Sequence, residues 1–241
     1  DKLSYYDLME IRVTEGEASF NSELQNDPID PESATFNEEW FDYYEPEQVD
    51  FKSSNFIFVG ANDPSLGKNK KSDTSGIIAP ALDLATGYMY AAEASIEKRK
   101  PDVIIDDIFE MNKRLKRDYG KGFFKFGVET VQFQYYFKEV MAQRSAEQGE
   151  YLPIEEIQSS ANKMLRIESL QPIVKNKYLK FRRDQKTLLQ QMKEFPMGRN
   201  DDAPDTLQMA VQLAQAVKST ATHGKYKSLI KRKFRMGKGA Y

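Results

Sequence analysis

The 241-residue sequence contains no cysteine and a single histidine, His223. These absences exclude disulfides, thiolate zinc sites and any metal site built from several histidines. A bound metal would need oxygen ligands, and such ligands favour Mg²⁺ or Mn²⁺ over zinc. The sequence also has no GxxxxGK[ST] loop, the phosphate-binding motif of many nucleotide hydrolases.

Long apolar runs are missing as well. No stretch approaches the ~18–20 apolar residues that cross a bilayer. The first residues, DKLSYYDLMEIR, have neither the basic start nor the apolar centre of a signal peptide. We therefore expect no membrane among the partners of this chain. Because the sequence begins with Asp rather than Met, we also expect it to be a piece of a longer protein.

The net charge of -2 conceals an uneven distribution. Residues 1–50 carry fifteen acidic and two basic side chains, whereas residues 218–241 carry eight basic side chains and no acidic one. We divide the chain into an acidic linker or appendage (1–50), a main domain (51–217) and a basic C-terminal tail (218–241). The tail is either a solvated terminus or an electrostatic contact for DNA phosphates or an acidic partner.

The order of apolar segments predicts an α/β fold. The run FIFVGAN (56–62) is typical of a central strand that is buried on both faces. Four further strands are expected, at residues 74–83, 87–95, 123–129 and 151–157. Helices are expected from Pro101, after residue 130, around residues 159–171 and 183–195, and over residues 204–217. The result is a five-stranded mixed sheet, three antiparallel strands plus two parallel ones, flanked by helices. An added hairpin is expected at residues 173–181, turning near Asn176 and Lys177.

Acidic residues stand at the ends of these apolar elements. Asp63 ends the first strand and Glu129 ends the fourth. Asp201 and Asp202 open the last helix. Ligand sites in α/β sheets lie at the carboxyl ends of strands, so these acids can converge there and hold two divalent cations for phosphodiester hydrolysis.

Each acid also has a structural interpretation. Asp63 precedes Pro64 and could start a turn. Glu129 could be a solvated acid that suits a helix dipole. Asp201 and Asp202 could cap the last helix, with Asp205 as an acid of its first turn.

Basic residues accompany the acids. Lys68, Lys70 and Lys71 follow Asp63 in a polar loop, and Lys163 and Arg166 belong to the predicted third helix. They are candidates for contacts with DNA phosphates, with ordinary surface positions as the alternative.

Four segments resemble the C-terminal nuclease region of bacteriophage terminase large subunits, the DNA-packaging motors. They are FVGANDPSLGKNKKSDTSGII, FGVETVQFQYYF, KMLRIESLQPIVKNKYLKF and FPMGRNDDAPDTLQMAV. The first 50 residues resemble the segment that links the packaging ATPase to the nuclease. The resemblance implies a ribonuclease H-like fold, two Mg²⁺ or Mn²⁺ ions, and cleavage of double-stranded phage DNA concatemers at the start and end of packaging.

The resemblance also implies roles for individual residues. Asp63, Glu129 and the Asp201–Asp202 pair correspond to the metal ligands, and Asp205 corresponds to a second acid of the last motif. Asn200 stands where relatives often have histidine. The implied partners are double-stranded DNA, the portal protein and the small terminase subunit, in the host cell cytoplasm.

Other functions are compatible with the same residues. One is a different ribonuclease H-like hydrolase, such as a junction resolvase or transposase core. Another is a non-catalytic module that binds DNA or the portal protein, in which the acids are structural. A glycosidase with two carboxylates fits less well, because the single tryptophan and the basic loop suit phosphate better than sugar.

Overall fold

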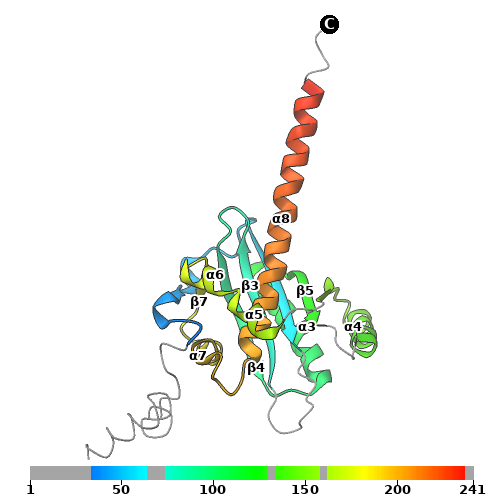
Figure 1. The fold of residues 1–241 in the computed structure, drawn as a ribbon. Coiled ribbons are helices and arrows are strands. Elements are labelled where there is room, and N and C mark those ends of the chain that lie inside the picture. Colours follow the sequence, from blue (N-terminus) through cyan, green and yellow to red (C-terminus); the bar gives the residue numbers. More distant parts are fainter. Residues whose placement is uncertain (1–33, 64–73, 130–133, 158–161, 237–241) are drawn as a thin grey trace, which may run out of the picture.

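The computed structural model describes residues 34–63, 74–129, 134–157 and 162–236. Its centre is a mixed sheet of seven strands in the order β1-β7-β4-β3-β2-β5-β6 (Figure 1). The strands are β1 (Asp42–Tyr43), β2 (Phe56–Asp63), β3 (Ser75–Asp83), β4 (Met89–Glu97), β5 (Phe123–Glu129), β6 (Ile154–Ile157) and β7 (Leu179–Phe181).

Five of these strands form the predicted mixed sheet. β2, β3 and β4 are antiparallel neighbours, and β5 and β6 add in parallel on the other side of β2. The apolar run of β2 thus lies in the middle of the sheet, where nearly all its side chains are buried. The expected ribonuclease H-like arrangement is confirmed at this level.

The predicted hairpin at residues 173–181 is wrong. Its first half belongs to α6 (Gln171–Lys175), which has Pro172 in its first turn, and the chain then turns at Lys177, whose φ is 60°. Only β7 is a strand, and it pairs in parallel with β4 and with β1 instead of with the preceding segment. The sheet is therefore extended by two short strands, not by a hairpin.

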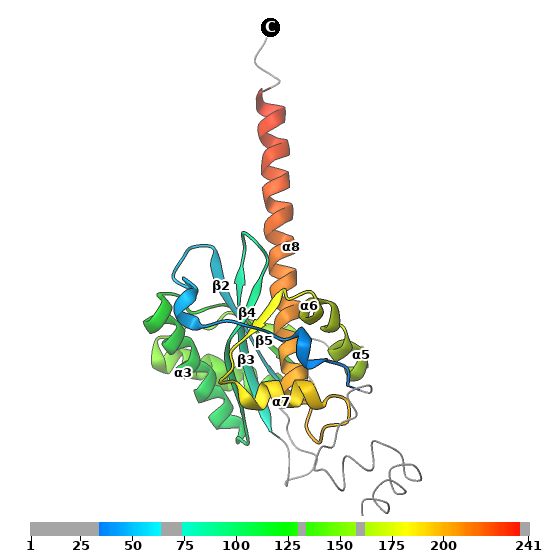
Figure 2. The same ribbon diagram turned by 90° about the vertical axis from the view of Figure 1, so that its left-hand side faces the viewer.

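Helices cover both faces of the sheet. They are α3 (Pro101–Tyr119), α4 (Gln134–Gln148), α5 (Lys163–Glu168), α6, α7 (Lys186–Glu194) and α8 (Asp202–Met236). Figure 2 shows α3 on one side of the sheet and α5 to α8 on the other. Successive side chains of a strand point to opposite faces, so Phe58 packs in the core beneath α3 and Val59 packs in the core beneath α8.

The end of the acidic N-terminal segment takes part in this core. Two 3-10 turns, η1 (Glu38–Trp40) and η2 (Pro46–Gln48), flank β1. Phe36, Phe41 and Tyr44 are buried, and the hydroxyl of Tyr44 donates a hydrogen bond of 3.2 Å to the carbonyl of Ala91. The aromatic residues before position 51 thus anchor this segment on the sheet.

The last helix is longer than predicted. It begins at Asp202, close to the expected start, and continues past Val217 to Met236. Figure 1 shows its C-terminal half extending beyond the sheet. Among the described helices, none combines the length and apolar character that a membrane span requires.

Candidate metal centre

Two carboxylates lie side by side at one edge of the sheet. Asp63 and Glu129 are the last residues of β2 and β5. These strands are parallel and place Asn62 opposite Val128, so the next residue of each strand emerges at the same edge. The parallel pairing of these two strands accounts for the proximity of the two acids.

Small residues let α8 approach the sheet closely beside these acids. Ala61 packs against Met209, and a Cβ atom added to Gly127 would lie 3.2 Å from Cδ2 of Leu213. Ala61 and Gly127 are paired across β2 and β5. Because side chains on one face recur at every second residue, Asp63, two residues beyond Ala61, faces α8.

Gly76 brings the first turn of α8 over the acidic edge. It pairs with Asp63 across β2 and β3, and an added Cβ would lie only 2.5 Å from Oγ1 of Thr206. Asp205 precedes Met209 by one helical turn, so it projects from the same face of α8. The close approach at Gly76 therefore sets how far Asp205 reaches toward the strand ends.

The structure brings three of the predicted acids together. Carboxylate oxygens of Asp63, Glu129 and Asp205 all lie within 4.8 Å of one another. Asp205 is 2% exposed, and its buried Oδ1 accepts no hydrogen bond, although Nη2 of Arg166 lies 3.1 Å away. A purely oxygen donor set in which a buried acceptor has only this ion-pair contact fits a hard divalent cation such as Mg²⁺ or Mn²⁺.

Burial, together with the crowding of negative charge, raises the proton affinity of Asp63 and Asp205. Burial raises the pKa of Asp63 to about 7, and repulsion from Asp205, Glu129 and Asp202 adds to the shift. Burial also raises the pKa of Asp205, although Lys163 and Arg166 partly offset it. A divalent cation would favour the ionised forms that these surroundings penalise.

Two basic residues of α5 partly compensate the acids. Lys163 Nζ lies 2.9 Å from Oδ1 of Asp201 and 3.3 Å from Oδ2 of Asp205. Arg166 lies 3.1 Å from Asp205 and 3.7 Å from Glu129. Burial lowers the pKa of Lys163, but its hydrogen bond to Asp201 and the nearby acidic charges raise it more strongly.

The other two predicted acids, Asp201 and Asp202, do not join the three convergent carboxylates. Asp201 is ion-paired with Lys163, and Asp202 accepts a hydrogen bond from Oγ1 of Thr74. Neither belongs to the group of three convergent carboxylates found among the described residues. Lys68, Lys70 and Lys71 lie outside the described residues.

Sequence reasoning gave less weight to Asp205 than the geometry does. Asp205, Met209 and Leu213 recur every four residues, which places the acid in line with the apolar side chains that face the sheet. This four-residue spacing is the sequence pattern from which the position of Asp205 could have been predicted. The ion pairs that Arg166 makes with two of the acids had no signal in the sequence, because they depend on how α5 packs.

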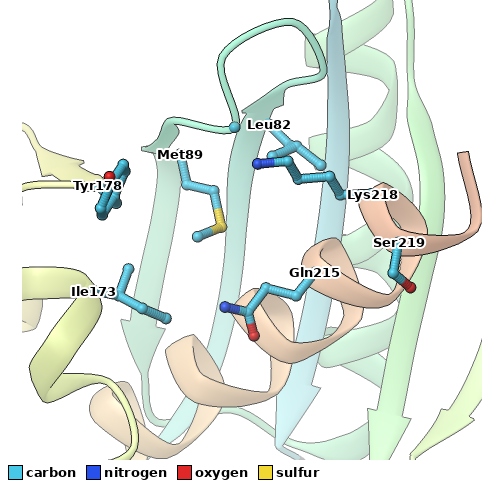
Figure 3. A pocket seen from close by; sticks show the side chains of 8 residues that line it. Leu82, Met89, Ile173, Tyr178, Gln215, Lys218 and Ser219 are labelled. Carbon is cyan, nitrogen blue, oxygen red and sulfur yellow. The ribbon is translucent and has the colours of Figure 1, made fainter. Parts of the chain in front are cut away.

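A separate cavity lies away from the carboxylates. It has a volume of about 530 Å³ and lies between the end of β3, the start of β4, α6 and α8, with Leu82, Met89, Ile173 and Lys218 in its lining (Figure 3). Leu82 is six residues along β3 from Gly76, roughly 20 Å at the rise of an extended strand. The cavity is thus at the opposite end of the sheet from the metal centre.

Comparison with known proteins identifies the fold. No protein-family model and no curated protein matches the sequence. Among solved structures, the human cytomegalovirus terminase nuclease domain matches with a TM-score of 0.59 and 13% identity, over 74% of this chain and 92% of that one. The same domain, manganese-soaked and inhibitor-bound, matches with a TM-score of 0.59 and 12% identity, over 78% of this chain and 98% of that one.

The phage P22 large terminase nuclease domain is a more distant match, with a TM-score of 0.48 and 13% identity, over 72% of this chain and 87% of that one. The cytomegalovirus domain, nearly all of which is covered, therefore identifies the fold. The chain has the fold of a viral terminase nuclease domain.

Proposed function

We propose that this chain is the nuclease domain of a DNA-packaging terminase large subunit, a metal-dependent endonuclease that cuts double-stranded viral DNA. The observation that carries the proposal is the convergence of Asp63, Glu129 and Asp205 within 4.8 Å, from the ends of two parallel strands and the first turn of a helix. The shared fold and the segments that resemble phage terminases support the same function.

The three carboxylates would hold the catalytic cation, and Asp202, whose charge acts on Asp63, would contribute to a second ion. Bound Mg²⁺ or Mn²⁺ lowers the pKa of water and stabilises charge on a phosphodiester during in-line displacement. In this account the carboxylates act as ligands, not as proton donors. The chain's own contribution is to fix their spacing through the β2–β5 register and the close approach of α8.

Lys163 and Arg166 give the acidic edge a basic border from which phosphates can be contacted. We expect low sequence specificity, because the part of the chain that the structure describes has no recognition helix of a kind that reads base edges. The proposal includes that this domain works in a packaging motor in the host cytoplasm, together with an ATPase, a portal protein and a small terminase subunit.

Plasmid cleavage tests the proposal. The wild-type chain is incubated with supercoiled DNA in Mn²⁺, Mg²⁺ or EDTA, beside Asp63→Ala and the control Asp118→Ala, which changes an exposed acid at the end of α3. We expect cutting that requires the cation, is lost in Asp63→Ala and persists in Asp118→Ala. No cutting by any of the proteins with either cation would instead favour a non-catalytic DNA-binding or portal-binding module.

A further inference from the structure

We infer that Lys163 is a displaceable counter-ion of the metal centre: its ammonium group compensates Asp205 and Asp201 until a divalent cation binds, and the cation then drives it away. This inference rests on the proposed function, because it assumes that the three carboxylates bind a metal. It assigns Lys163 a role in metal loading that is separate from any contact with DNA.

The position of Lys163 meets the first requirement of a counter-ion. Its Nζ bridges two carboxylates, at 2.9 Å from Asp201 and 3.3 Å from Asp205. Asp205 is also one of the three acids whose oxygens converge. A cation that binds Asp205 therefore enters beside a carboxylate that Lys163 now compensates, and the two positive charges repel each other.

The exposure of Lys163 meets the second requirement, which is that the contact can be released. The side chain of Lys163 is 38% exposed and that of Asp201 is 43% exposed. Exposed ion pairs contribute little net stability, because water solvates both groups well when they separate. The flexible lysine stem can also move its ammonium into solvent without any change in the path of α5.

Arg166 also bridges two carboxylates but differs from Lys163 in its exposure. Its side chain is 12% exposed, and its Nη2 lies 3.1 Å from Oδ1 and 3.2 Å from Oδ2 of Asp205. Its Nη1 lies 3.7 Å from Oε1 of Glu129. Separating a buried pair of this kind leaves an uncompensated buried charge, so Arg166 stays in place when a cation arrives.

The charges of the cluster agree with this division. The three convergent carboxylates carry three negative charges when ionised, and the fixed Arg166 compensates one of them. Lys163 supplies one further positive charge without a metal, whereas a single divalent cation supplies the two that remain. Exchange of Lys163 for the cation thus neutralises the buried group more completely.

Metal titration without DNA tests the inference. Isothermal calorimetry with MnCl₂, repeated with MgCl₂, compares the wild-type chain with Lys163→Met, Lys163→Arg and the control Lys113→Met. Lys113 is an exposed lysine of α3 that pairs with Glu110, so its replacement removes one positive charge far from the acids.

We expect Lys163→Met to bind Mn²⁺ about five-fold more tightly than the wild type, since the cation no longer competes with an ion pair of ordinary strength. Lys163→Arg should bind with nearly wild-type affinity, and Lys113→Met should be unchanged. A residue that merely supported the fold would show no gain in affinity on removal.

Equal or weaker metal binding by Lys163→Met, with metal binding intact in the wild type, would overturn the inference and leave the proposed function standing. Equal tightening by Lys113→Met would also overturn it, since the effect would then be one of net charge. Failure of the wild-type chain to bind either cation would overturn both the inference and the proposed metal centre.

Discussion

The raised pKa of Asp63 leads to a quantitative prediction for the metal-free protein. The pKa rises from 3.8 to about 7 on folding, chiefly because the carboxyl is buried. Because Asp63 binds its proton more tightly in the folded state, protonation of Asp63 stabilises the fold, and this stabilisation is fully present below about pH 4. The stabilisation is lost as the pH rises through 7. At about 1.4 kcal/mol per pKa unit, ionisation of Asp63 costs at most about 4 kcal/mol at pH 8.

The variant Asp63→Asn removes this ionisation while keeping the size of the side chain. In EDTA we expect Asp63→Asn and wild type to have similar melting temperatures near pH 4. The variant should become progressively more stable than wild type toward pH 8, by up to roughly 10 °C for a domain of this size. Differential scanning fluorimetry from pH 4 to pH 8.5 measures the difference.

Addition of Mn²⁺ at pH 8 should give wild type the higher melting temperature, because the cation stabilises the carboxylate of Asp63 and not the amide of Asp63→Asn. A difference between Asp63→Asn and wild type that stays constant across the pH range would refute the reasoning. It would mean that Asp63 ionises as freely in the folded chain as in the unfolded chain.

Two further substitutions test how the site is held. Gly76→Ala should weaken Mn²⁺ binding and destabilise the fold by about 1–3 kcal/mol, because its Cβ would meet Thr206 at 2.5 Å and push the first turn of α8 from the sheet. Calorimetry measures the metal affinity, and urea unfolding measures the stability. Wild-type values for both would show that α8 can shift without consequence. Arg166→Met should lower the free energy of unfolding in EDTA by about 3 kcal/mol, because Asp205 and Glu129 lose a buried partner. Added Mn²⁺ should recover part of this loss in stability. An unchanged midpoint of urea unfolding would contradict a structural role for the ion pairs of Arg166.

The part of the fold that was predictable is the part fixed by short, strongly apolar segments. The run of β2 is apolar at almost every position, as a strand buried on both faces requires, and β5 has a similar run. Once these two strands are placed in parallel, Asp63 and Glu129 must share an edge. The pairing of two site residues therefore followed from sequence and topology alone.

The parts that were not predictable depend on tertiary contacts. In residues 173–181, apolar and polar residues alternate over too short a length to separate helix from strand. Burial of Val174 in α6 and the pairing of β7 with β4 decide the outcome. The change to a basic composition near Lys218 predicts the end of the last helix there, although the helix continues to Met236.

The choice of acids at the start of α8 depends on the same kind of information. The adjacent pair Asp201–Asp202 is conspicuous in the sequence, but successive residues of a helix point in directions about 100° apart. The rotation of α8 on the sheet, fixed by Ala61 and Gly76, selects Asp205 for the group of three. Lys163 pairs with Asp201 outside that group.

The most direct test of the central claim compares two acids that lie four residues apart. Plasmid cleavage in Mn²⁺ is measured for wild type, Asp205→Asn and Asp201→Asn, with folding of each variant verified by circular dichroism. A metal centre formed by Asp63, Glu129 and Asp205 predicts a loss of at least about 100-fold for Asp205→Asn and a much smaller effect for Asp201→Asn. Full activity of Asp205→Asn, or a greater loss in Asp201→Asn, would contradict the account.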